Sequence, residues 1–217
     1  MWRWWAKVKR WFDKIPGRKA MSVQTELESA RRFGAQLEEL VVRRGQCPND
    51  DRTILLMAYW ALIFDYHKGI LSLISNGFCG SAFTLVRPVV EALVRSHVAV
   101  KGSTDDVQNL QQDKYRVNFT TVGTWIDTEF GLGDFFTKFL TRTRDALHSY
   151  THAGVSQLAR RFNGHDLKPR YEDDEIIEVI RTCTSAVWMV TNLVTKHLHF
   201  DAESEKAQKL FLEWGKR

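Results

Sequence analysis

A row of basic side chains at four-residue spacing is the feature of this sequence best suited to chemistry. Arg144, His148 and His152 follow one another four residues apart, so they share one face if the segment is helical. A histidine exchanges protons near neutral pH, and an arginine beside it can stabilise negative charge on a phosphate. Arg142 lies just before this row on a flanking face. The alternative is that both histidines only hydrogen-bond the end of a helix that stops at Gly154.

A second charged row lies within an apolar stretch. Arg87, Glu91 and Arg95 are also four residues apart, so each arginine can reach the glutamate. Their neighbours are mostly leucine and valine, and charges among such residues must be paired or must face a cleft. Pro88, in the interior of the same predicted helix, predicts a bend there. The row is either a structural ion-pair network, or part of a site with Arg87 and Glu91 as catalytic candidates and Arg95 as a substrate-binding one.

The histidine pair also raises the question of a metal site. Two histidines at positions i and i+4 of a helix can bind one metal ion. Ser149 stands where the zinc protease motif has a glutamate, and a third ligand would have to come from elsewhere, with Glu91 as the candidate. The sequence contains no glycine-rich phosphate loop, no nucleophile elbow and no cysteine pair at metal-ligand spacing. We therefore expect neither a metal nor a cofactor.

Other basic residues could bind a polyanionic substrate. Arg160 and Arg161 precede a loop with further basic residues, and together they could hold RNA phosphates. The basic residues of the loop are His165, Lys168 and Arg170. A solvated charge cluster is the alternative for this group. His67, within a very apolar segment, is a further substrate-binding candidate, with a satisfied buried group as the alternative.

Residues 1–15 predict an amphipathic helix, which a proline and a glycine then end. Its apolar face carries Trp4, Trp5, Trp11 and Phe12, with basic residues on the opposite face. Indole rings and cations on opposite faces suit contact with a membrane surface or a partner protein. The alternatives are that the helix packs on the body of the protein, or that Met21 is the natural start and residues 1–20 are an extension. The segment has no apolar run of signal-peptide or membrane-spanning length.

The elements that must position these residues are helices. Apolar residues recur at helical spacing over most of the chain, without convincing strand patterns or internal repeats. The predicted helices cover residues 23–44, 52–75, 81–100, 103–119, 134–152, 172–199 and 201–214. We therefore predict an all-α protein: a single bundle of about six main helices over residues 21–217, and an extra N-terminal helix within residues 1–20.

Several details of these helices can be predicted. Residues 52–75 are apolar almost all round, which indicates a central helix, antiparallel to its neighbour across a short turn. Ser81 should cap that neighbour, and Ser103 and the acidic residues 172–175 should begin later helices. Residues 163–171 should form a loop.

Composition indicates a folded protein in reducing surroundings. The chain has 217 residues, which is enough to bury a core without disulfides or metals. Its three cysteines are widely spaced and odd in number, which favours the cytoplasm. A peripheral position at the inner membrane is the alternative if residues 1–15 bind lipid. The net charge of +5 comes largely from the first nineteen residues, so the near-neutral body does not indicate a dedicated DNA-binding domain.

Two short motifs carry a resemblance to known proteins. They are Gly80-Ser81-Ala82-Phe83 with Arg87-Pro88 and Glu91, and Leu147-His148-Ser149-Tyr150-Thr151-His152-Ala153-Gly154. Over roughly residues 50–199, the chain is similar to a bacterial family of all-α proteins without a settled activity. Some members resemble the HEPN group of helical bundles, many of which are dimeric ribonucleases of toxin–antitoxin and anti-phage systems. The HEPN pattern is an arginine, four to six residues and a histidine, which Arg142 and His148 match, although Thr143 stands where an asparagine, aspartate or histidine usually follows the arginine.

Three functions follow as hypotheses. The first, implied by the resemblance, is a homodimeric, metal-independent ribonuclease of anti-phage defence or a toxin, with Arg142 or Arg144 at the scissile phosphate and His148 as acid or base. The second is a non-catalytic helical module that docks a membrane or a partner protein through residues 1–15. The third is a metal-dependent hydrolase that uses His148, His152 and Glu91.

Overall fold

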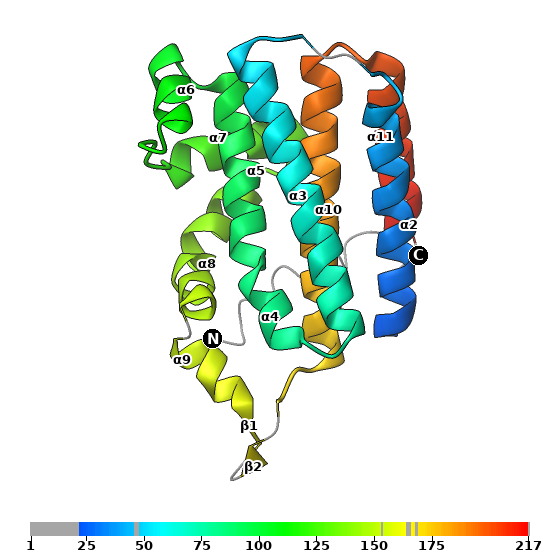
Figure 1. Cartoon of the computed structure of the whole chain (residues 1–217), viewed down its shortest axis with the longest axis vertical. Helices are drawn as coiled ribbons and strands as arrows, with labels where there is room; N and C mark the ends of the chain where they lie inside the picture. The colour runs from blue at the N-terminus through cyan, green and yellow to red at the C-terminus, as the bar shows by residue number, and fades with distance from the viewer. Residues whose placement is uncertain (1–21, 46–47, 153, 164–165, 168, 217) are drawn as a thin grey trace.

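The protein is an all-α bundle, which confirms the predicted fold class (Figure 1). The computed structural model describes residues 22–45, 48–152, 154–163, 166–167 and 169–216, and the amphipathic helix predicted for residues 1–15 lies outside them. The helices are α2 (Val23–Val42), α3 (Asp51–Ser75), α4 (Cys79–Thr84), α5 (Val86–Lys101), α6 (Thr104–Gln111), α7 (Phe119–Phe130), α8 (Phe135–Thr151), α9 (Val155–Leu158), α10 (Asp173–His197) and α11 (Asp201–Gly215).

Helix α10 forms the centre of the bundle. It packs against α2, α3, α5 and α11, and its residues are buried from Glu175 almost without interruption to Thr195. The predicted acidic start is confirmed, because Glu172 and Glu175 form a reciprocal capping box at its first turn. Helix α8 lies at the side of this bundle, where it packs on α7 and α9 and touches α4 and α5.

Helix α3 is less central than its apolar sequence predicted. It runs antiparallel to α5, as expected, and buries one face that includes Trp60 and His67. Its other side leaves Ile54 and Leu62 exposed, because α5, α10 and α2 cover only part of its circumference. Among the described residues, α3 is the helix long and apolar enough to cross a membrane, by length and composition only.

The predicted helix 81–100 is divided in two, which corrects both its cap and its bend. Leu85 separates α4 from α5, and Phe78 rather than Ser81 occupies the N-cap position of α4. Pro88 therefore lies in the first turn of α5 and not in a helix interior. The first backbone N–H groups of a helix have no partner within it, so proline removes no helical hydrogen bond there.

Two further segments differ from the sequence prediction. Ser103 caps α6 as expected, but α6 ends at Gln111, and a separate helix, α7, lies where no helix was predicted, between the predicted helices 103–119 and 134–152. The predicted loop contains a short antiparallel pair, β1 (Phe162–Asn163) and β2 (Asp166–Leu167). Strands of two residues are too short to leave an alternating pattern in the sequence.

Asp127 of α7 holds the beginning of α8. Its buried carboxylate accepts hydrogen bonds from the backbone N–H of Phe136 (2.7 Å) and of Thr137 (2.9 Å), and from Thr137 Oγ1 (2.7 Å). Asp134, at the N-cap position of α8, makes no capping hydrogen bond with its side chain. Gly123 permits this contact, since a Cβ atom there would lie 2.8 Å from Thr137 Cα. Helix α7 therefore supplies the cap that α8 lacks.

We expect Asp127→Ala to lower the free energy of unfolding by about 2–4 kcal/mol, because it leaves buried N–H donors of α8 without an acceptor. Urea denaturation followed by circular dichroism would measure the change. Asp134→Ala is the matched control, and its effect should stay within about 0.5 kcal/mol because that carboxylate is exposed and pairs with Lys138 on the surface. Equal effects of the two substitutions would contradict the anchoring role of Asp127.

Candidate functional site

The two charged rows meet at the end of α8. Arg87, in the first turn of α5, donates from Nη1 to Nδ1 of His148, in the last turn of α8, over 2.8 Å. Arg87 Nε donates to Glu91 Oε1 over 2.7 Å. The ring centroids of His148 and His152 lie 4.3 Å apart. We call Arg87, Glu91, His148 and His152 the histidine cluster.

The hydrogen bond to Arg87 fixes the protonation of His148 in this arrangement. A guanidinium has only donors, so Nδ1 of His148 must accept with its lone pair. The ring is then neutral and carries its proton on Nε2. Glu91 holds the Nε side of the same guanidinium, which orients Arg87 toward the histidine.

The histidine cluster is open to solvent. The side chains of Arg87 and Glu91 are 28% and 36% exposed, and His148 and His152 are also exposed. These charges therefore do not stand alone in the core, and a dissolved ligand can reach them. An arginine next to two proton-exchanging rings is an arrangement suited to binding an anion and moving protons on it.

The end of α8 is positioned by aromatic residues that were not among the predicted site residues. Tyr150 is buried two residues after His148 and packs on Phe83 of α4 with ring centroids 5.8 Å apart. Tyr171 packs on the same phenylalanine at 5.0 Å. Burial raises the pKa of both tyrosines, so their hydroxyls keep their protons at neutral pH. Phe83 and Tyr150 both belong to the two sequence motifs described above, and this was the feature of the sequence from which their role could have been predicted.

The arginine row does not continue through Arg95. Its Nη1 lies 3.7 Å from Oδ1 of Asp113, in the turn after α6, instead of pairing with Glu91. This corrects the expectation that both arginines of the row reach the glutamate. Arg95 therefore contacts Asp113 and does not belong to the histidine cluster.

The arginine that reaches His148 comes from α5 rather than from α8. Arg142 is exposed and precedes His148 by six residues, which separates the two by about 120° around the helix axis. They therefore do not share a face, and Arg87 occupies Nδ1 of His148 instead. The side chain of Arg144 lies outside the described part of the structure.

His67 is a buried core residue. Thr184 Oγ1 donates to the carbonyl of Ile180 over 2.7 Å, so it accepts from His67 Nε2 at 3.0 Å. The other edge of the ring faces Gly34, where a Cβ atom would lie 3.0 Å from Cε1. Burial lowers the pKa of His67 to about 4. These contacts match the satisfied buried group and do not bring His67 to the histidine cluster.

Arg160 and Arg161 differ sharply in environment. Arg160 forms a bidentate ion pair with Glu175, in which Arg160 Nη2 lies 2.6 Å from Glu175 Oε1. Both side chains are largely buried. Arg161 is exposed, and its guanidinium and the hydroxyl of Tyr171 lie 3.1 and 2.8 Å from the place where a Cβ on Gly80 would stand. Gly80 thus makes room for both groups, and Arg160 holds the chain against α10 rather than facing solvent.

The rest of the predicted basic loop contributes little that can be placed. Arg170 pairs with Glu172 at 3.2 Å on the surface, and His165 and Lys168 lie outside the described residues. The described part of the chain also contains no group of three histidine, cysteine, aspartate or glutamate side chains placed to hold a metal ion. Glu91 is bound to Arg87, and the same arginine occupies the Nδ1 lone pair of His148.

Comparison of the chain with protein-family models, with curated proteins and with solved structures found no match.

Proposed function

We propose that the histidine cluster cleaves RNA without a metal ion, through attack of a ribose 2′-hydroxyl on the adjacent phosphate. The observation that carries this proposal is the 2.8 Å hydrogen bond between Arg87 and His148 at an exposed position, with a second histidine ring beside it. RNA supplies its own nucleophile, so the protein needs only a base, an acid and a cation for the phosphate. The histidine cluster contains these three kinds of group.

Each residue has a defined part in the proposed reaction. Arg87 turns from His148 to a phosphate oxygen, which frees the Nδ1 lone pair of His148 to take the proton of the 2′-hydroxyl. The 2′-oxygen bonds to phosphorus as the bond to the 5′-oxygen breaks, and His152 in its protonated form gives that oxygen a proton. The products are a 2′,3′-cyclic phosphate and a 5′-hydroxyl. Exchange of protons with water then restores both histidines.

The surroundings of the histidine cluster support binding of a polyanion. Arg142 on α8 and Arg161 after α9 are exposed cations on the elements next to it. Exposed arginines bind backbone phosphates without regard to base sequence, and their contribution falls as salt rises. Glu91 holds Arg87 in place and does not face the substrate in this scheme.

The proposal predicts that His148→Ala and His152→Ala each slow cleavage of a fluorescent single-stranded RNA at least about 100-fold, because each removes a proton-transfer group. The assay contains EDTA, and mass spectrometry identifies the cyclic phosphate on the product. His199→Asn is the matched control. His199 is an exposed histidine just after the C-terminal end of α10, and its backbone has a positive φ that asparagine tolerates.

A 2′-O-methyl version of the same oligonucleotide should remain intact, because its nucleophile is blocked. The proposal is wrong if the purified protein does not cleave the RNA, if His148→Ala cleaves at the rate of the unchanged protein, or if the methylated strand is also cut. Cleavage that EDTA abolishes would instead favour the metal-dependent hydrolase.

A further inference from the structure

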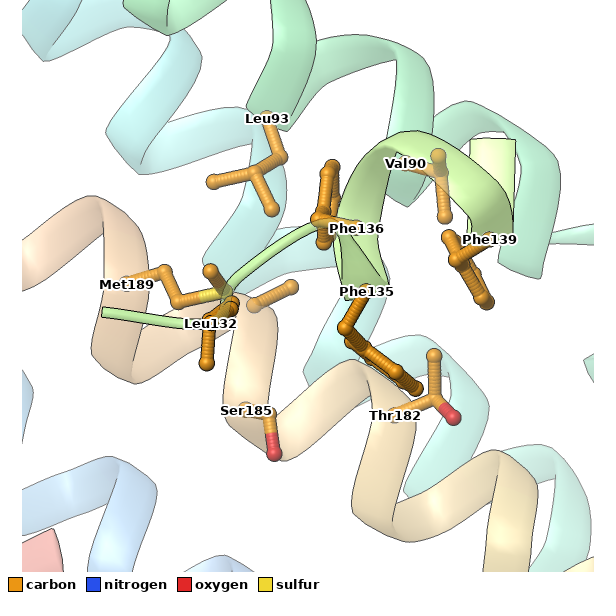
Figure 2. A pocket seen from close by; sticks show the side chains of 10 residues that line it. Val90, Leu93, Leu132, Phe135, Phe136, Phe139, Thr182, Ser185 and Met189 are labelled. Atoms are coloured by element: carbon orange, nitrogen blue, oxygen red, sulfur yellow. The ribbon is translucent and has the colours of Figure 1, made fainter. Parts of the chain in front are cut away.

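We propose that residues 1–15 dock on the protein's own surface, in a pocket between α5, α8 and α10. We call it the phenylalanine pocket; its lining includes Phe135, Phe136 and Phe139 of α8, Val90 and Leu93 of α5, and Thr182, Ser185 and Met189 of α10 (Figure 2). This inference is independent of the proposed ribonuclease activity.

The size of the phenylalanine pocket favours a second protein element over a free ligand. Its volume is about 50 Å³, well below the roughly 300–1,000 Å³ of pockets that enclose a small molecule. Its walls are almost entirely apolar and three of them are phenylalanine rings. A shallow apolar hollow of this kind fits one or two large side chains from a helix that lies across it.

The open surface of the α10 wall is apolar, although the wall contains hydroxyl groups. The hydroxyl oxygens of Thr182 and Ser185 are buried, and within the described residues neither has a hydrogen-bond partner; Ser185 is only 8% exposed. Because these oxygens have almost no exposed surface, an occupant of the pocket meets α10 through apolar atoms.

Residues 1–15 have the matching chemistry. Their apolar face presents Trp4, Trp5, Trp11 and Phe12, and an indole combines a large apolar ring with an N–H group that only donates. Their other face is basic. The large apolar rings of the segment thus complement the apolar surface of the pocket.

The segment is also within reach of the pocket. Glu26, in the first turn of α2, accepts a hydrogen bond of 2.8 Å from Arg181 Nη2, and Arg181 directly precedes Thr182 of the pocket wall. The described chain therefore starts beside α10, and to reach the pocket it must pass around this one helix, which is about 10–12 Å across. Residues 16–21 can span about 20 Å when extended, which is enough to lead residues 1–15 onto the pocket.

Hydrogen–deuterium exchange on the full chain tests this docking. Combined substitution of Trp4→Ala, Trp5→Ala and Trp11→Ala should speed exchange of residues 132–139 at least about tenfold, because the cover of the pocket is lost. The matched control is Arg3→Ala, Lys7→Ala and Arg10→Ala, which changes the basic face and should leave that segment nearly unaffected. Exchange in residues 54–62 of α3 should stay the same in both variants.

A photo-crosslinking amino acid at position 11 of the full chain gives a second measurement that does not depend on stability. Crosslinks within one chain to residues 132–139 or 182–189 would support the docking. Crosslinks only between chains, or only to the exposed face of α3, would overturn it. Unchanged exchange in the tryptophan variant, with binding of the unchanged protein to phosphatidylglycerol vesicles, would overturn it in favour of a membrane contact.

Discussion

Acidification from pH 6.5 to pH 4 is expected to lower the free energy of unfolding by roughly 6 kcal/mol, because two histidines are buried in their neutral form. Burial lowers the pKa of His67 and of His97 from 6.5 to about 4. The unfolded chain therefore binds protons first as the pH falls. The stabilisation is complete above pH 6.5 and is lost between pH 6.5 and 4, at roughly 1.4 kcal/mol per pH unit for each histidine.

The surroundings of both rings support this direction. His97 donates from Nδ1 to the carbonyl of Leu93 over 2.9 Å, and within the described residues its Nε2 has no hydrogen-bond partner that could stabilise a second proton. Lys101 lies near His97 and Lys68 near His67, and both cations oppose a positive ring. Glu129 acts in the other direction on His97, but more weakly than burial does.

Urea denaturation at several pH values between 6.5 and 5 would measure this dependence. The variant His97→Phe keeps a ring next to Phe130 and removes one titrating group, so the slope should fall from roughly 2.8 to roughly 1.4 kcal/mol per pH unit. A slope that is the same in both proteins would show that His97 does not cause the pH dependence.

Replacement of Arg160 by methionine is expected to destabilise the protein by about 3–5 kcal/mol, because Glu175 would be left as a buried charge without its partner. The side chains of the Arg160–Glu175 pair are only 13% and 8% exposed. The comparable pair on the surface is Arg170–Glu172, with side chains 57% and 54% exposed, and Arg170→Met should cost no more than about 1 kcal/mol.

A double variant separates the buried charge from other effects of the substitution. Arg160→Met combined with Glu175→Leu should regain part of the stability lost in Arg160→Met, because no unpaired charge remains in the interior. Thermal and urea denaturation of the unchanged protein, Arg160→Met, Glu175→Leu and the double variant would give the coupling energy between the two positions. Similar stabilities of Arg160→Met and Arg170→Met would contradict the structural role of Arg160.

The sequence predicted the helices well because their signals are local. Apolar periodicity and capping residues such as Asp50, Ser103 and Glu172 depend only on neighbours in the chain, and all three stand at the N-cap positions of helices. The exceptions are helix α7, which was not predicted because Gly123, Gly131 and Gly133 interrupt its stretch of sequence, and two helix boundaries. The break at Leu85 and the end of α6 at Gln111 change a helix without changing its apolar pattern.

The candidate site could be predicted only in part, because its contacts join distant segments. The charged spacing on each helix indicated Arg87, Glu91, His148 and His152, but the choice of Arg87 over Arg142 as the partner of His148 depends on how α5 and α8 cross. Arg95 lies near Asp113, whose backbone has a positive φ of 54° that could not be predicted from the sequence. Hydrogen bonds across such separations are set by packing and leave no periodic signal.

Helix α8 is held near both ends, which keeps His148 in place against α5. Asp127 binds the backbone at Phe136 and Thr137, and Tyr150 packs on Phe83 near the other end. His148 lies twelve residues, or about 18 Å, beyond Phe136 along the helix. A rotation of only about 5° about the first turn would move His148 by about 1.5 Å, which is enough to open its hydrogen bond of 2.8 Å to Arg87. The packing of Tyr150 therefore protects this hydrogen bond against small tilts of α8.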